Sequence, residues 1–193
     1  MSQSGLPDVY SNLDDLERFV ILFRLNFPNV AIVLTSGTFD IKHVGHDRYL
    51  NEAGKRGYLV VGIDGDEKVK QRKGESRPIV CEEERVESLQ YHRAVGVIYV
   101  KQLTDTKWAL IKAVSPDVLI ISERSGYSDQ DIQALSEFCG EVIKLESQAE
   151  TSTSARIRDI VIGEIGPMIK DAEGIYEQLA AFVTKLKHIK GGT

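Results

Sequence analysis

The fold is decided by the stretch Thr35-Ser36-Gly37-Thr38-Phe39-Asp40-Ile41-Lys42-His43-Val44-Gly45-His46. Before it lies an apolar run, residues 30–36, with the length and the Val and Ile content of a strand buried on both faces. After it comes an amphipathic segment over about residues 45–55, which indicates a helix. Because ligands bind outside the carboxyl ends of strands in open α/β sheets, the stretch predicts a strand, a ligand-binding turn and a helix, in that order.

Strand-like and helix-like segments continue to alternate downstream of this unit. Further strands are expected at 58–64, 95–100, 117–122 and 141–145, and further helices at about 82–91, 107–114 and 129–138. This alternation predicts a doubly wound, Rossmann-like α/β fold with a mainly parallel five-stranded sheet. We expect the domain to cover 30–165, with a helical extension at 1–29 and a C-terminal helix and tail at 166–193.

Both flanks carry apolar residues at helical spacing. One stripe runs through Leu13, Leu16, Val20, Phe23 and Phe27, after a capping candidate at Ser11 or Asn12. The other lies within 168–187 and contains Ile175, Leu179, Phe182 and Leu186. Such stripes are expected to cover the core, with subunit contact as the less favoured interpretation.

Composition indicates a soluble, cytoplasmic protein. The 193 residues carry a formal net charge of −5, so nothing attracts the whole molecule to nucleic acid or to an anionic membrane, and anionic substrates need a local basic pocket. No stretch has membrane-spanning length, and the N-terminus lacks the pattern of a signal peptide. The two cysteines, Cys81 and Cys139, have no metal-ligand spacing.

The turn combines a glycine with two histidines. Gly37 would let a nucleotide approach the backbone, and His43 and His46, three residues apart, would share one face of the first helical turn. Backbone N–H groups and the helix dipole attract phosphate at that place. Two imidazoles there can donate hydrogen bonds to a phosphoryl group, and a triphosphate would favour their charged form. Zinc binding is the alternative, but the spacing is wrong for the helical zinc motif and no third ligand is evident.

At this point the sequence resembles a known superfamily. Residues 37–46 are similar to the signature of the cytidylyltransferase-like nucleotidyltransferases, which include glycerol-3-phosphate cytidylyltransferase and the heptose-phosphate adenylyltransferases. Residues 70–79, followed by Glu84-Arg85, resemble the heptose type in particular. Thr151-Ser152-Thr153-Ser154 with Arg158 resembles the motif that opens the last helix of that fold. The resemblance covers about residues 30–165 and contains three motifs in the right order.

The resemblance implies transfer of CMP or AMP from CTP or ATP, with Mg²⁺, to a phosphorylated sugar, polyol or alcohol, and release of pyrophosphate. It implies catalytic roles for His43, His46 and Lys73. It implies nucleotide binding by Gly37, Thr38, Phe39, Gly45, Ser152, Thr153, Ser154 and Arg158. It implies substrate or phosphate binding by Asp40, Lys70, Arg77 and Arg85. Metal ligands are not specified, and a homodimer is compatible with the family.

Several residues have a structural alternative. The hydroxyls of 152–154 can cap a helix, Asp40 can cap the histidine helix, and Arg85 can form an ion pair with Glu82 or another neighbour. Lys68 and Arg72 are interpreted as solvated neighbours of the phosphate-binding cations.

The sequence departs from the family where base and acceptor are discriminated. Residues 121–127 differ from the heptose enzymes, and Ser147 stands where the cytidylyltransferases have an arginine. The donor nucleotide therefore stays open, and the alternative function is a nucleotide-binding sensor or scaffold without turnover. A dinucleotide-dependent oxidoreductase is disfavoured because no Gly-x-Gly-x-x-Gly follows the first strand.

Overall fold

The computed structural model describes residues 5–123, 125–146, 148 and 169–180. The chain divides into two compact units, Met1–Glu150 and Thr151–Thr193. The elements of the first unit are β1 (Asp8–Tyr10), α1 (Leu13–Asn26), β2 (Ile32–Gly37), α2 (Val44–Gly54), β3 (Tyr58–Asp64), α3 (Asp66–Lys73), α4 (Glu82–Gln90), β4 (Val95–Lys101), α5 (Ala109–Val114), β5 (Val118–Ser122), α6 (Asp129–Leu135) and β6 (Glu141–Leu145). In the second unit, residues 169–180 form a helix within the longer segment predicted to be helical.

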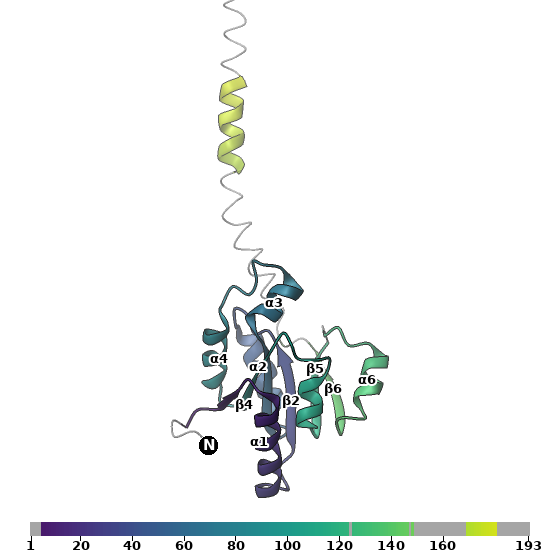
Figure 1. Cartoon of the computed structure of the whole chain (residues 1–193). Helices are drawn as coiled ribbons and strands as arrows, with labels where there is room; N and C mark the ends of the chain where they lie inside the picture. Colours follow the sequence, from purple (N-terminus) through teal and green to yellow (C-terminus); the bar gives the residue numbers. More distant parts are fainter. Residues whose placement is uncertain (1–4, 124, 147, 149–168, 181–193) are drawn as a thin grey trace, which may run out of the picture. The chain divides into compact units, whose positions relative to one another are not determined.

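The strands form one parallel sheet in the order β1-β4-β3-β2-β5-β6 (Figure 1). The expected parallel α/β architecture is confirmed, but within the described residues the sheet has six strands and not the five expected from the sequence. The additional strand, β1, lies in the N-terminal segment that was expected to be helical, and it pairs with β4 through Asp8 and Val97. With only three residues, β1 is too short to show an alternating pattern.

Apolar residues cover both faces of the sheet. On one face Ile32 and Leu34 of β2 pack with α1, α5 and α6, while on the other Val33 packs with α2 and α4. Successive side chains of a strand point to opposite faces, so a strand buried between two layers of helices must be apolar throughout. The continuous apolar runs in the sequence have this cause.

Helix α1 covers the first of these faces. Asn12 caps it by accepting from the backbone N–H groups of Asp14 and Asp15, so the second of the two capping candidates is the one used. Leu16 and Val20 are buried against the sheet. This confirms that the N-terminal stripe covers the core, except at Phe27, which is 45% exposed.

Helix α3 was not expected. Its eight residues are mostly charged and bury only Val69, so the sequence has no amphipathic period there. It follows β3 directly and carries Lys70, Arg72 and Lys73 in its last turn. The helix therefore returns the basic residues toward the carboxyl edge of the sheet.

The strand order places a switch point between β2 and β5. From β2 the chain continues to β3 and β4 on one side, and then crosses to β5 and β6 on the other. Ligands of doubly wound sheets bind in the crevice at such a point. The turn between β2 and α2, which holds both histidines, begins there.

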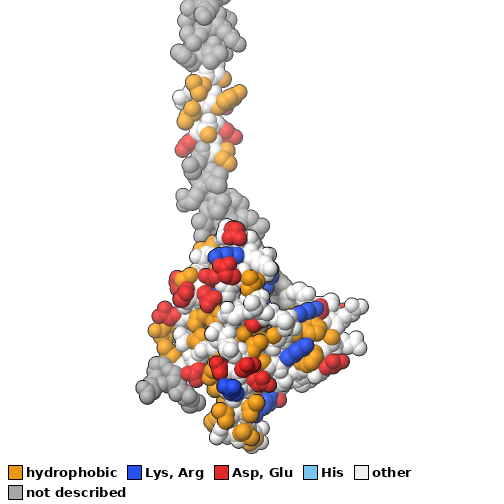
Figure 2. All heavy atoms as spheres, in the orientation of Figure 1, with side chains coloured by type: hydrophobic (Ala, Val, Ile, Leu, Met, Phe, Trp, Pro, Cys, Tyr) orange, Lys and Arg blue, Asp and Glu red, His pale blue; other side chains and the backbone are white. Residues whose placement is uncertain are grey.

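On the face shown in Figure 2, acidic and basic side chains are interspersed, without a continuous basic patch among the residues coloured there. None of the helices in the described ranges combines the length and the apolar character that crossing a bilayer requires.

Candidate active site

The turn after β2 holds a strained backbone. Phe39 and Ile41 have φ angles of 52° and 44°, in the left-handed region that non-glycine residues rarely adopt. The Phe39 ring folds back over Gly37, where an added Cβ would lie 3.0 Å from the ring, and it meets the His46 ring edge-on at 5.6 Å. In this structure Gly37 thus makes room for Phe39, which is buried and supports the second histidine.

His43 and His46 cap the helix that they begin. His43 is the N-cap residue of α2, and its Nδ1 accepts from the Gly45 backbone N–H at 3.1 Å. In return, the His43 backbone N–H donates to Nδ1 of His46 at 3.3 Å. A nitrogen that accepts carries no proton, so each neutral ring bears its proton on Nε2. The rings lie 4.1 Å apart between centroids, and the cap fixes both as Nε2–H donors.

His46 is held in its neutral form. Burial, followed by the neighbouring His43, lowers the pKa of His46 to about 4. The shift toward the charged form that we expect from a bound triphosphate concerns the liganded protein and stays a prediction. A neutral imidazole with a fixed Nε2–H still donates one directed hydrogen bond to a phosphoryl oxygen.

Asp40 organises the adjacent loop. It is buried, and its Oδ1 accepts from the backbone N–H groups of Ile79 and Val80 at 3.1 and 3.0 Å. Its Oδ2 lies 2.8 Å from the Arg77 guanidinium, which is itself largely buried. Asp40 does not cap α2, because His43 does so. The charge of Arg77, expected to bind phosphate, is paired with Asp40 in this structure.

Arg85 is a buried side chain that connects several backbone segments around the site. It is 1% exposed, and its guanidinium donates to the carbonyl oxygens of Thr38, Asp64 and Val80 at 2.7 to 2.9 Å. It also forms an ion pair with Asp66, where Glu82 had been one expected partner. The geometry favours the structural alternative for Arg85, since these contacts join the ends of β2 and β3 to the loop before α4.

Beside the histidine turn lies a group of charges centred on the Thr38 hydroxyl, which we term the cation cluster: Thr38, Asp64, Arg72, Lys73 and Lys101. Thr38 Oγ1 accepts from Arg72 at 2.8 Å and from Lys73 at 3.2 Å, and it lies 3.3 Å from Asp64 Oδ2. Asp64 pairs with Arg72 at 2.7 Å and with Lys101 at 3.1 Å. Lys73, expected to be catalytic, and Thr38, expected to bind nucleotide, are thus brought together.

Electrostatics in the cluster follow from burial and proximity. Burial raises the pKa of Asp64, but Lys101 and Arg72 outweigh it, and the pKa lies below its ordinary value. Burial, with Arg72 and Arg77 beside it, lowers the pKa of Lys73. The cluster therefore contains a buried anion and several cations held close together.

The other basic residues of α3 lie differently from what the sequence suggested. Lys70, expected to bind phosphate, is partly exposed and pairs with Glu67 one turn earlier. Arg72, interpreted as a solvated neighbour, is the residue that reaches the cluster. Lys68 donates to the carbonyl of Gln102. The remaining predicted residues, Ser152, Thr153, Ser154 and Arg158, lie outside the described residues.

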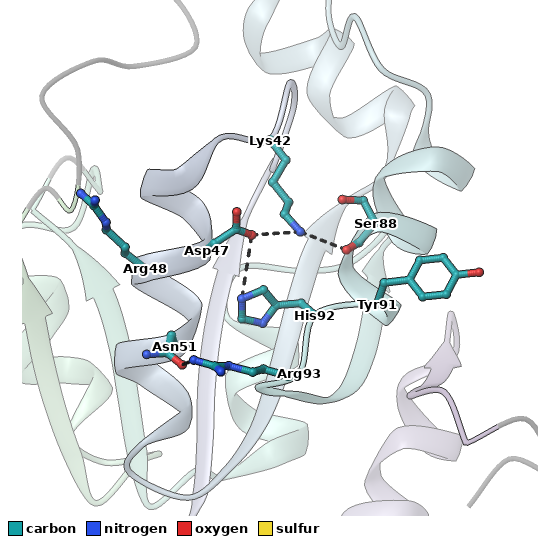
Figure 3. Close-up of a pocket in the computed structure, with 8 residues that line it drawn as sticks. All are labelled: Lys42, Asp47, Arg48, Asn51, Ser88, Tyr91, His92 and Arg93. Atoms are coloured by element: carbon teal, nitrogen blue, oxygen red, sulfur yellow. Dashed lines mark hydrogen bonds and ion pairs between the residues drawn. The ribbon is translucent and has the colours of Figure 1, made fainter.

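A second polar feature lies along α2 and the end of α4. A pocket of about 500 Å³ is lined by Lys42, Asp47, Arg48, Asn51, Ser88, Tyr91, His92 and Arg93 (Figure 3). Lys42 donates to the Ser88 carbonyl and pairs with Asp47 at 3.0 Å, while His92 Nε2 lies 3.9 Å from the same carboxylate. Lys42 and Asp47 are sequence neighbours of the two turn histidines, so this network anchors the start of α2 from the side.

Mg²⁺ is not provided with a preformed protein site in the described part of the chain. There, no group of three or more His, Cys, Asp or Glu side chains gathers as a metal site would require. Asp40 and Asp64 are each committed to basic partners. Mg²⁺ is often bound by substrate phosphates and water with few protein ligands, and the described residues are compatible with a metal that arrives with the nucleotide.

A family model described as cytidylyltransferase-like matches residues 34–178, which include the histidine turn and the basic segment of α3. The chain belongs to the cytidylyltransferase-like family. This places it among the nucleotidyltransferases, as the resemblance of residues 37–46 implied.

Curated relatives carry the name bifunctional protein HldE. The protein from Helicobacter pylori strain P12 is 38% identical over 164 residues, covering 78% of this chain and 35% of the relative. The protein from Helicobacter acinonychis is 37% identical over 141 residues, covering 72% of this chain and 30% of the relative. The chain thus spans about a third of the length of these relatives.

Solved structures support the fold. A lipopolysaccharide core biosynthesis protein from Thermoplasma volcanium aligns with a TM-score of 0.53 and 24% identity, over 62% of this chain and 98% of that one. A pantoate-beta-alanine ligase from Francisella tularensis aligns with a TM-score of 0.56 and 12% identity, over 77% of this chain and 69% of that one.

Proposed function

We propose that the chain transfers a nucleoside monophosphate from ATP or CTP to a sugar phosphate and releases pyrophosphate. The observation that carries this proposal is the reciprocal cap of His43 and His46, which fixes two Nε2–H donors at the switch point of a doubly wound sheet. The neighbouring cation cluster supplies the local positive charge that an acidic protein needs to bind phosphates.

ATP and a sugar phosphate are the first pair to test. The relatives named HldE and the resemblance of residues 70–79 to the heptose-type adenylyltransferases support this choice. CTP and polyol or alcohol phosphates remain the second choice, since residues 121–127 differ from the heptose type.

The proposed reaction is an in-line displacement. An oxygen of the acceptor phosphate forms a bond to the α-phosphorus, the bond from that phosphorus to the bridging oxygen breaks, and pyrophosphate leaves with the electron pair. His43 and His46 donate from Nε2 to the oxygens that gain charge, and Lys73 neutralises phosphate beside Thr38. Mg²⁺ bound to the triphosphate would supply further charge neutralisation. No proton has to be removed from an ionised acceptor phosphate, so the residues need only align and stabilise charge.

Two variants separate chemistry from helix capping. His43→Asn keeps a side-chain acceptor at the N-cap, and His46→Gln keeps a residue type that completes a capping box from the third helical position, but both remove the imidazole donor. We expect each to lower kcat for pyrophosphate release by about 10²-fold or more. Arg18→Met, which changes a largely exposed side chain of α1, is the control and should retain kcat within about threefold.

The assay couples pyrophosphate release to a colour reaction, with ATP or CTP against a panel of sugar 1-phosphates and glycerol 3-phosphate. Full activity in His43→Asn would overturn the proposed role of the turn. Triphosphate binding without pyrophosphate release from any acceptor would instead support the alternative of a nucleotide sensor. Far-UV circular dichroism and melting temperatures check that all variants are folded.

A further inference from the structure

The ends of β3 and β4 carry an ion pair that the histidine turn does not use. Asp64 ends β3 and Lys101 ends β4, and the two residues are directly opposite each other in the strand register. The switch point lies on the other side of β2, between β2 and β5. The pair therefore stands beside the nucleotide crevice and not within it.

Burial differs sharply between the partners. The Asp64 side chain is 3% exposed, whereas those of Lys101 and Arg72 are 24% and 57% exposed. A buried carboxylate thus holds two cations whose outer surfaces face solvent. Because Asp64 is buried at the end of β3 and pairs with both side chains, it holds the head groups of Lys101 and Arg72 in position, and a ligand does not need to order them.

The formal charges of the cation cluster do not cancel. Arg72, Lys73 and Lys101 contribute three positive charges, and Asp64 contributes one negative charge. Two nearby carboxylates add nothing to the balance, because Asp40 is paired with Arg77 and Asp66 with Arg85. The excess matches a phosphate monoester, which carries between 1.5 and 2 negative charges at about pH 7.

We propose that Lys101 and Arg72 form the subsite for the phosphate of the acceptor. This assignment rests on the proposed function. Thr38 Oγ1 accepts from both Arg72 and Lys73, so the two head groups are neighbours. A phosphate held by Lys101 and Arg72 would lie next to Lys73, on the opposite side of β2 from the crevice. The Thr38 hydroxyl that both Arg72 and Lys73 contact belongs to the segment leading into the histidine turn, so this phosphate would lie at the edge of that turn.

The test separates the two phosphate sites by filling one of them. The wild type is saturated with the α,β-methylene analogue of the donor triphosphate, which cannot release pyrophosphate, and is then titrated with inorganic phosphate and with glycerol 3-phosphate by calorimetry. The variants are Lys101→Gln, Arg72→Gln and Lys101→Arg. Lys68→Gln is the matched control, since it removes a lysine from the same helix as Arg72 that is bonded to a backbone carbonyl outside the cluster.

We expect Lys101→Gln and Arg72→Gln to weaken binding of both phosphate probes about tenfold, and to change the affinity for the triphosphate analogue less than threefold. Lys101→Arg should retain most of the phosphate affinity because the charge is kept, and Lys68→Gln should match the wild type. In turnover, the same glutamine variants should raise the KM for the acceptor and leave the KM for the triphosphate near its wild-type value.

A loss of analogue affinity with unchanged phosphate affinity would place these cations on the triphosphate and overturn the assignment, while the proposed function would stand. Unchanged affinity for both ligands would show that Lys101 and Arg72 serve only the ion pair, and would overturn it as well. If the wild type binds no triphosphate analogue, the proposed function fails first and the assignment falls with it.

Discussion

Replacing Arg85 by methionine tests how much of the site depends on one buried side chain. Methionine fills a similar volume but donates no hydrogen bond, so the carbonyl oxygens of Thr38, Asp64 and Val80 lose their partner, as does the Asp66 carboxylate. Breaking a fully buried ion pair by removing one partner costs about 3 to 5 kcal/mol, and the Asp66 side chain is 29% exposed, so this range is an upper bound here. Asp66 and the loop oxygens can recover part of this through water, so we expect a loss of about 3 kcal/mol.

Urea unfolding followed by circular dichroism measures the effect. The loss should appear as a lower midpoint with little change in slope, since the surface exposed on unfolding is nearly the same. Arg85→Lys keeps the charge but cannot reach all four acceptors, so it should lose about 2 kcal/mol. Arg18→Met is the control, because the Arg18 side chain is 77% exposed, and it should change stability by less than about 0.5 kcal/mol. An Arg85→Met variant within 1 kcal/mol of the wild type would refute the view that this residue holds the turn in place.

Three further predictions concern the residues around the turn and the sheet. The pKa of His46 is about 4 in the folded chain and near its ordinary 6.5 when unfolded, so the unfolded chain takes up the proton first and the free energy of unfolding should fall as the pH drops from 6.5 toward 4. In urea titrations at pH 7 and pH 5, His46→Gln should lose less stability between the two pH values than the wild type. An equal loss in both proteins would contradict this prediction. Gly57→Ala places a Cβ 2.1 Å from the Ala31 carbonyl oxygen at a φ of +155°, so we expect a loss of about 3 kcal/mol in urea unfolding, and a neutral result would show that the loop relaxes freely. Thr35→Val removes a buried hydroxyl that donates to the Ile120 carbonyl at 3.0 Å and contacts the Tyr49 hydroxyl at 2.7 Å, which should cost about 1 to 2 kcal/mol in thermal unfolding, and an unchanged melting temperature would argue that water replaces it.

The sequence predicted those parts of the fold that have a long apolar pattern. Strands buried on both faces must be apolar throughout, so β2 and β3 could be placed within two residues of their bounds. Helix α3 buries only Val69, and its formation depends on its position after β3 and not on a period of its own. Strand β1 depends on pairing with β4, a contact between distant parts of the chain that leaves no local pattern.

The candidate site residues could be predicted where their place between a strand and a helix was visible in the sequence. His43 and His46 could be found because they stand at a strand end before a helix. Choosing among Lys68, Lys70 and Arg72 required the direction of each side chain on α3, and no pattern in that charged helix indicates which face meets Thr38. Asp64 and Lys101 were missed for a related reason, because only the strand register brings the ends of β3 and β4 together. A polar residue ending an otherwise apolar strand was the available signal.

The histidine cap has a consequence for how protonation and folding compete. Nδ1 of His43 accepts from the Gly45 N–H in the first turn of α2, and Nδ1 of His46 accepts from the N–H of the N-cap residue His43. A proton added at Nδ1 of His46 would face the His43 backbone N–H, so the charged form of His46 cannot accept this cap bond. Acid strong enough to protonate His46 would therefore remove this cap bond, while the backbone bonds from His46 and Asp47 to the His43 carbonyl would remain. His46 therefore brings no positive charge to the site. Instead, the cap provides two Nε2–H donors, on His43 and His46, whose directions are set by the backbone.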